Sequence, residues 1–171
     1  PLPARFVAVG LASVTLTAML GMVFALVRGG IVDDPRLIDL AAQGIPLHAI
    51  AGLGGWLTFC AMGVSYRLFA MFMLAPELER RGTRAALHLG ACAIVIAVPG
   101  GIVAIWTGRS LDAVLIASAI AGLGALSLYG RDMLHLYRVR KRRAIELNTR
   151  MAVLAFASLG LTVLLAIVLA A

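Results

Sequence analysis

Long apolar stretches, separated by short polar segments, dominate the hydrophobic pattern of this chain. The apolar residues form continuous runs rather than alternating with polar ones. Runs of about 20 apolar residues predict helices that cross a membrane. The pattern therefore predicts an all-α fold, a single transmembrane bundle of five spans at residues 6–27, 45–74, 85–106, 111–130 and 151–171.

Glycine, proline and aspartate residues mark the ends of these spans. Gly29 and Gly30 end the first span, and the linker 33–36 combines aspartate caps with a proline that fixes φ. The second span opens near Ile45 and Pro46, because proline is tolerated in the first turn of a helix. At about 30 residues, or about 45 Å, this span exceeds the hydrocarbon core of about 30 Å, so tilt or a protruding end must absorb the excess.

The third and fourth spans each carry an irregular feature. Pro99 lies inside the third span and removes one backbone hydrogen bond, so we expect a kink or a broken helix there. Trp106 ends that span as an interfacial anchor. Beyond the fourth span, we expect the helix to continue through 131–143 as a basic extension.

Composition and charge favour a membrane protein and exclude a nucleic-acid-binding one. The 171 residues are 62% hydrophobic and 13% charged, whereas a soluble domain averages about 45–50% and about 25%. The net charge of +7 lies in short loops between spans rather than in a basic domain. Three cationic residues (Arg28, Arg36 and Arg109) lie on one side. Ten cationic residues lie on the other side: Arg5, Arg80, Arg81, Arg84, Arg138, Arg140, Lys141, Arg142, Arg143 and Arg150. The positive-inside rule places this side, with the N-terminus, in the cytoplasm of a bacterial-type inner membrane.

His48 heads a face of the second span that is rich in glycine. Gly52, Gly55 and Gly63 follow it at spacings that return to nearly the same side of a helix. The glycines would leave a groove along this face. A histidine at the head of the groove could bind the iron of a b-type heme as an axial ligand, with the flat macrocycle packed against the glycines. Alternatively, the glycines seat a neighbouring helix and His48 bonds an interfacial carbonyl, because glycine stripes commonly serve packing. The pattern leaves both alternatives open.

His88, His135 and Arg67 are the other candidate cofactor-binding residues. His88 and His135 both lie toward the predicted cytoplasmic side, on the order of 10 Å apart along the axis, so a shared heme and separate interfacial positions both stay open. Arg67 could neutralise a heme propionate or a quinone oxygen, or snorkel to the interface and pair with Asp132 or Glu146. We expect no carboxylate within an apolar core, which disfavours a proton or cation pathway.

Two segments of the second span resemble one known family. Residues 46–57 (PLHAIAGLGGWL) and 63–69 (GVSYRLF) are similar to the second helix of the heme–copper oxidase subunit I superfamily, which includes relatives of nitric oxide reductase. The resemblance implies that His48 is an axial ligand of a low-spin heme. Many relatives carry two histidines separated by one residue, and here Ile50 takes the second position. The superfamily core also has many more helices, so we expect no oxygen or nitric oxide reduction by this chain alone.

Three functions follow as alternatives. The first is an electron-transfer subunit of a respiratory-type complex, with a b-type heme on the second span. The second is a non-catalytic structural or assembly subunit that packs small-residue faces against other membrane subunits. The third is a small transporter in which the helix kinked at residues 99–101 is the moving element. The expected lack of buried charge disfavours this third function. Whether the chain belongs to an enzyme stays open; the expected partners are the lipid bilayer and other membrane subunits.

Overall fold

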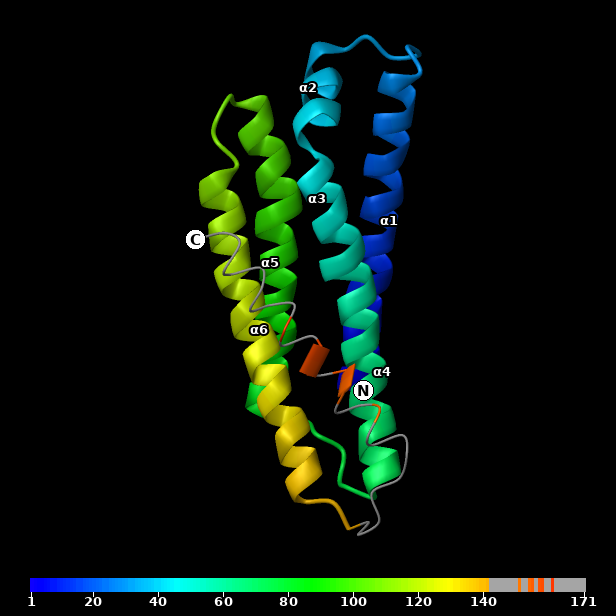
Figure 1. Cartoon of the computed structure of the whole chain (residues 1–171), viewed down its shortest axis with the longest axis vertical. Helices are drawn as coiled ribbons and strands as arrows, with labels where there is room; N and C mark the ends of the chain where they lie inside the picture. The colour runs from blue at the N-terminus through cyan, green and yellow to red at the C-terminus, as the bar shows by residue number, and fades with distance from the viewer. Residues whose placement is uncertain (142–150, 152–153, 156, 159–160, 162–171) are drawn as a thin grey trace.

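The structure, a computed structural model, describes residues 1–141, 151, 154–155, 157–158 and 161. Over these residues the chain is helical and contains no strand, which confirms the all-α class (Figure 1). Within the described residues, four stretches are long and apolar enough to cross a membrane, so the chain is a multi-pass helical bundle. Of the predicted fifth span, 151–171, most residues lie outside the described part of the chain. The elements are α1 (Leu2–Arg28), α2 (Pro35–Gln43), α3 (Ile45–Ala49), η1 (Ile50–Leu57), α4 (Thr58–Met73), α5 (Arg81–Trp106) and α6 (Asp112–Arg138).

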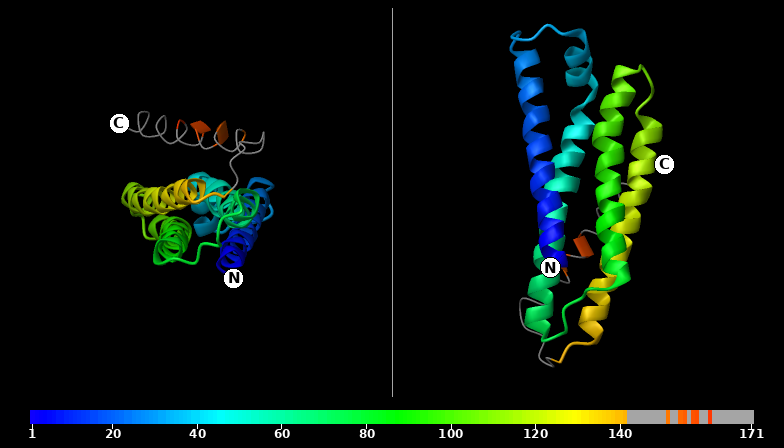
Figure 2. Two further views of the ribbon diagram at one scale, coloured as in Figure 1. Left: turned by 90° about the horizontal axis from the view of Figure 1, so that it is seen from below. Right: turned by 180° about the vertical axis from the view of Figure 1, so that it is seen from behind.

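Successive spans run in opposite directions and pair as two hairpins (Figures 1 and 2). α1 packs along η1 and α4, and α5 packs along α6. One end of the bundle brings together the start of α1, the end of α4, the start of α5 and the end of α6, and we call it the basic end. Nine of the twelve described Lys and Arg residues lie there. The positive-inside rule predicts that the basic end faces the cytoplasm.

Local chemistry explains several element boundaries. Oδ1 of Asp34 caps α2 by accepting hydrogen bonds from the backbone N–H groups of Arg36, at 2.9 Å, and Leu37, at 3.2 Å. The second span begins at Ile45, as predicted. α5 ends at Trp106, also as predicted, and the indole Nε1 donates to the carbonyl oxygen of Arg36 at 3.2 Å. This contact joins the end of α5 to the short helix α2.

The irregular backbone lies in the second span rather than in the third. α5 runs unbroken through Pro99, so of the two expected outcomes the broken helix is wrong and the kink stays a prediction. Transmembrane helices tolerate the hydrogen bond lost at a proline, because neighbouring helices and small backbone adjustments satisfy the freed carbonyl. By contrast, η1 is a π-helix, and the hydroxyl of the following Thr58 donates to the carbonyl oxygen of Leu53 at 2.7 Å. π-Helical turns are frequent at functional sites.

The hairpins meet in an aromatic core toward the basic end. Phe6 on α1 is fully buried, with its ring centroid 5.9 Å from that of Phe59 and 5.3 Å from that of Tyr66. α6 continues past residue 130 to Arg138, which confirms the predicted basic extension over the described residues. Leu136 on this extension is fully buried, so the extension belongs to the packed bundle.

Candidate functional site

The glycine face of the second span packs directly against α1. A Cβ added to Gly55 would lie 2.5 Å from Cβ of Ser13, and one added to Gly63 would lie 2.8 Å from a carbonyl oxygen of α1. At Gly52 the corresponding distance to Cγ2 of Thr17 is 3.4 Å. Glycine lets the two backbones approach closely, as small residues do at helix contacts in lipid. Gly52 and Gly55 therefore seat α1, which is the packing alternative that the sequence left open.

His48 belongs to the same interface, near the end of the bundle opposite the basic end. Its ring centroid lies 5.8 Å from that of Phe24 on α1, and its Cε1 would lie 3.2 Å from a Cβ added to Gly21. Its Nδ1 is buried and has no hydrogen-bond partner among the described residues. An unsatisfied buried nitrogen of this kind calls for a partner such as an ordered water.

A heme bound to His48 does not fit on the glycine face. Ser13 and Thr17 occupy the space beside Gly55 and Gly52 that the macrocycle would need. Binding there would require α1 to move away from the second span.

His88 and His135 are not brought together. Both belong to the α5–α6 hairpin, whose register is fixed where Gly90 packs against Ala125; a Cβ added to the glycine would lie 3.5 Å from Cβ of the alanine. His88 is therefore level with about residue 127, and His135 lies about two helical turns, or roughly 12 Å, nearer the basic end. His88 is exposed and His135 is partly buried. In this arrangement the two side chains do not flank a common heme.

Arg67 forms an exposed ion pair with Glu77 at the basic end. Its side chain is 65% exposed, so it reaches the surface as the snorkelling alternative predicted. The prediction that it pairs with Asp132 is wrong, because that carboxylate faces inward and bonds two hydroxyls. The other predicted partner, Glu146, lies outside the described residues.

A buried carboxylate joins three helices near the basic end. Asp132 on α6 is 4% exposed, and its Oδ2 accepts hydrogen bonds from the hydroxyl of Tyr66 on α4, at 3.1 Å, and from Oγ1 of Thr83 on α5, at 2.7 Å. The expectation that no carboxylate lies within the apolar core is therefore wrong. The partners lie 66 and 49 positions away in the sequence, so only the packing of the helices reveals them. The sequence held one weak indication of this contact, because Tyr66, Thr83 and Asp132 all lie near the same predicted membrane surface.

Next to this network, Ser65 and Tyr129 bridge the contact between α4 and α6, which we call the α4–α6 seam. Their hydroxyl oxygens lie 2.6 Å apart, and the hydroxyl of Ser65 also donates to the carbonyl oxygen of Met62. The ring of Tyr129 meets that of Tyr66 edge to face, with centroids 5.4 Å apart. The seam is open on both sides of this bridge, as an upper cleft and a lower groove.

The upper cleft lies on the side of the bridge away from the basic end. It has a volume of about 430 Å³ and is lined by residues of α3, η1, α4, α5 and α6. Its polar side chains are already engaged, because Thr58 donates to the carbonyl oxygen of Leu53 and Ser118 donates to that of Ala93. Small residues make up much of its lining: Gly54, Gly90, Ala93, Ala119, Gly122 and Ala125.

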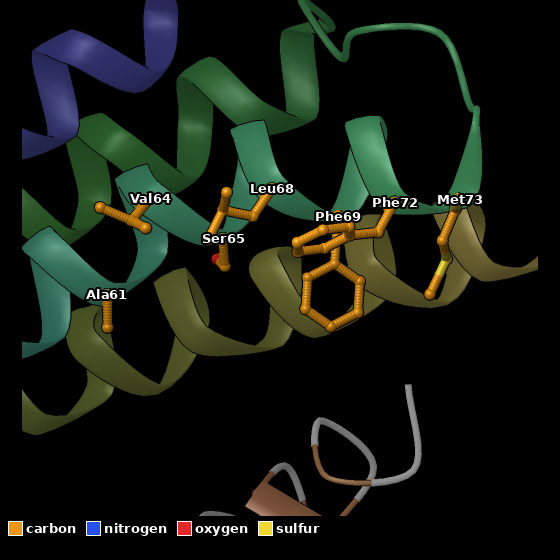
Figure 3. Close-up of a pocket in the computed structure, with 7 residues that line it drawn as sticks. All are labelled: Ala61, Val64, Ser65, Leu68, Phe69, Phe72 and Met73. Atoms are coloured by element: carbon orange, nitrogen blue, oxygen red, sulfur yellow. The ribbon is translucent and has the colours of Figure 1, made fainter. Parts of the chain in front are cut away.

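The lower groove runs along α4 from Ala61, about one turn beyond the bridge, to Met73 near the basic end (Figure 3). Its volume is about 190 Å³. Figure 3 shows the side chains of Phe69 and Met73 reaching over α6. The lining is apolar except for the already bonded Ser65, and it consists of Ala61, Val64, Ser65, Leu68, Phe69, Phe72 and Met73.

Compared with known proteins, the chain matches no family model, no curated protein and no solved structure. The described residues offer three features that bear on function. They are the glycine-packed interface with its unsatisfied His48, the buried Asp132, and the open parts of the α4–α6 seam.

Proposed function

We propose that the chain is a non-catalytic subunit of a larger membrane complex, and that a transmembrane helix of a partner subunit packs into the upper cleft. The observation that carries this proposal is the lining of that cleft. Small residues from η1, α5 and α6 face a space of about 430 Å³ in the α4–α6 seam. Helices associate in lipid chiefly through close backbone contact at such residues.

The chemistry of the upper cleft supports packing over catalysis or transport. Binding sites for small molecules usually place a few free polar groups among apolar ones. Here the hydroxyls of Thr58 and Ser118 donate to backbone carbonyls of their own bundle. Among the described residues, no ionisable side chain lines the cleft. An apolar helix is therefore a better match than a polar substrate.

The membrane and its sidedness belong to the same proposal. The complex lies in a bacterial-type inner membrane, with the basic end and the N-terminus in the cytoplasm. The distribution of charge supports this orientation, since nine of the twelve described Lys and Arg residues gather at the basic end. The upper cleft then lies toward the outer leaflet.

Site-specific photocrosslinking in native membranes tests the proposed helix contact. A photoreactive benzoylphenylalanine replaces Ala119, which lines the upper cleft, and in a matched control replaces Ile120, which is 67% exposed on α6 outside the lining. The expected result is an adduct at Ala119 alone, mapping to a transmembrane segment of one polypeptide that also co-purifies at fixed stoichiometry. Lipid adducts only, or a link within the chain to residues 151–171, would contradict the proposal.

One observation favours a second candidate, an electron-transfer subunit that shares a b-type heme with a partner chain. His48 is partly exposed, so a heme held by a partner chain could bind the imidazole from outside the α1 interface, whereas the unsatisfied Nδ1 faces Gly21 of α1. The reduced-minus-oxidised absorption spectrum of the intact complex tests this candidate. A b-type signal that disappears in His48→Ala, but persists in His88→Ala, would support it. A spectrum that His48→Ala leaves unchanged would exclude His48 as the ligand.

A further inference from the structure

The lower groove has the shape and polarity of a site for one acyl chain. Six of its seven lining residues are apolar, and the hydroxyl of Ser65 is bonded to Tyr129. Ala61 and Met73 mark its two ends along α4, about 18 Å apart at 1.5 Å per residue. One leaflet of a bilayer, half of a hydrocarbon core of about 30 Å, is about 15 Å thick. The groove therefore runs through about one leaflet.

Cationic side chains lie where the groove reaches the basic end. The backbone N–H of Lys141 donates to the carbonyl oxygen of Met73 at 3.1 Å, which holds the segment after α6 against the end of the groove. Arg138 and Lys141 are exposed, and neither forms an ion pair in the described part of the chain. Arg140 lies over the ring of Tyr137, with its guanidinium carbon 4.0 Å from the ring centroid. A half-buried tyrosine at this level is typical of a membrane interface.

We propose that the lower groove binds an anionic phospholipid of the phosphatidylglycerol type. One acyl chain lies along Val64, Leu68 and Phe69, and the phosphate lies beside Arg138 and Lys141. Charge complementarity selects this occupant, because the groove is apolar and the two cations at its end form no ion pair with any described residue. A zwitterionic lipid offers the same acyl chain but no net charge, so it binds more weakly. The inference is independent of any partner in the upper cleft.

Native mass spectrometry of the full chain in detergent tests the proposal. The protein is titrated with dioleoyl phosphatidylglycerol and, separately, with dioleoyl phosphatidylcholine. The double variant Arg138→Gln/Lys141→Gln removes the cations at the end of the groove. Arg109→Gln is the matched control, since this exposed cation lies at the opposite end of the bundle. Ala61→Phe fills the deep end of the groove from an exposed position and leaves every charge in place.

We expect wild type and Arg109→Gln to retain phosphatidylglycerol in preference to phosphatidylcholine. Each neutralised cation should weaken phosphatidylglycerol binding about fivefold, the equivalent of about 1 kcal/mol per charge near a membrane surface. Ala61→Phe should weaken the binding of both lipids. Equal retention of the two lipids by the wild type would overturn the proposal. The proposal would also be overturned if Arg138→Gln/Lys141→Gln lost phosphatidylglycerol binding while Ala61→Phe lost none. Attraction to surface charge alone would then explain the preference for the anionic lipid.

Discussion

The hydroxyl of Tyr66 donates a hydrogen bond to the carboxylate of Asp132 across 3.1 Å, although 66 positions separate the two residues in the sequence. With Thr83 as a second donor, this carboxylate joins one helix hairpin to the other near the basic end. A carboxylate within a transmembrane bundle needs such partners, because the surrounding apolar groups and lipid do not solvate it. The contact is thus a buried polar link between the two hairpins, beside the bridge between Ser65 and Tyr129.

Replacing Asp132 should destabilise the bundle. In Asp132→Leu, the hydroxyls of Tyr66 and Thr83 lose their acceptor, so we expect the free energy of unfolding to fall by about 1–3 kcal/mol. Asp132→Asn keeps an acceptor oxygen and should lose less. Unfolding in mixed micelles, followed by circular dichroism, measures both. Asp112→Asn, an exposed residue at the other end of α6, is the control and should change little. Equal stability of Asp132→Leu and wild type would contradict this account.

The glycine interface should not tolerate a side chain. In Gly55→Ala, the new Cβ would lie 2.5 Å from Cβ of Ser13, so we expect a loss of about 1–3 kcal/mol from overpacking. Gly130→Ala is the matched control, because no atom lies within 4 Å of a Cβ added there. It should be neutral or stabilising by up to about 1 kcal/mol. Ser13→Gly should rescue Gly55→Ala in thermal unfolding, and failure of the rescue would argue against direct contact.

The upper cleft should control association rather than folding. A Cβ added to Gly122 would make an ordinary contact of 3.9 Å with Ala93, so Gly122→Phe should fold while its ring fills the cleft. We expect at least a tenfold fall in the amount of partner subunit that co-purifies, with an unchanged melting temperature. Ile120→Phe, outside the cleft, serves as control. Partner recovery that is equal in both variants would remove the upper cleft from the proposed function.

Arg67 should contribute little to the stability of the fold, in contrast to Asp132. Its ion pair with Glu77 joins two side chains that are 65% and 60% exposed. Exposed pairs of this kind stabilise by about 1 kcal/mol or less, and salt screens them. Arg67→Gln should therefore lower stability by no more than that, and less at high ionic strength. A loss comparable to that of Asp132→Leu would show that Arg67 has a buried partner.

Local sequence features predicted the spans but not the contacts between them. Asp34, Ile45 and Trp106 mark element boundaries through capping, proline tolerance and interfacial anchoring, which depend on neighbouring residues alone. Asp132 was misjudged because its donors lie on other helices. Likewise, a glycine face indicates that something approaches closely, without saying whether that is a helix or a cofactor. The π-helix η1 has no local sequence signature beyond its glycines. The predicted pairing of Arg67 with Glu146 stays a prediction, because Glu146 lies outside the described residues.

The central claim is that α1, rather than a cofactor, occupies the glycine face of the second span. Disulfide trapping tests it most directly. In a background with Cys60 and Cys92 replaced by alanine, Thr17→Cys is paired with Gly52→Cys. A Cβ added to Gly52 would lie 3.4 Å from Cγ2 and 3.7 Å from Oγ1 of Thr17, close enough for a bond between these positions.

Mild oxidation in native membranes, followed by mass measurement, reports the bond. We predict nearly complete cross-linking of Thr17→Cys/Gly52→Cys and none of the control Thr15→Cys/Gly52→Cys, whose α1 residue is exposed. No cross-link in a folded Thr17→Cys/Gly52→Cys protein, together with a heme absorption band, would contradict the claim.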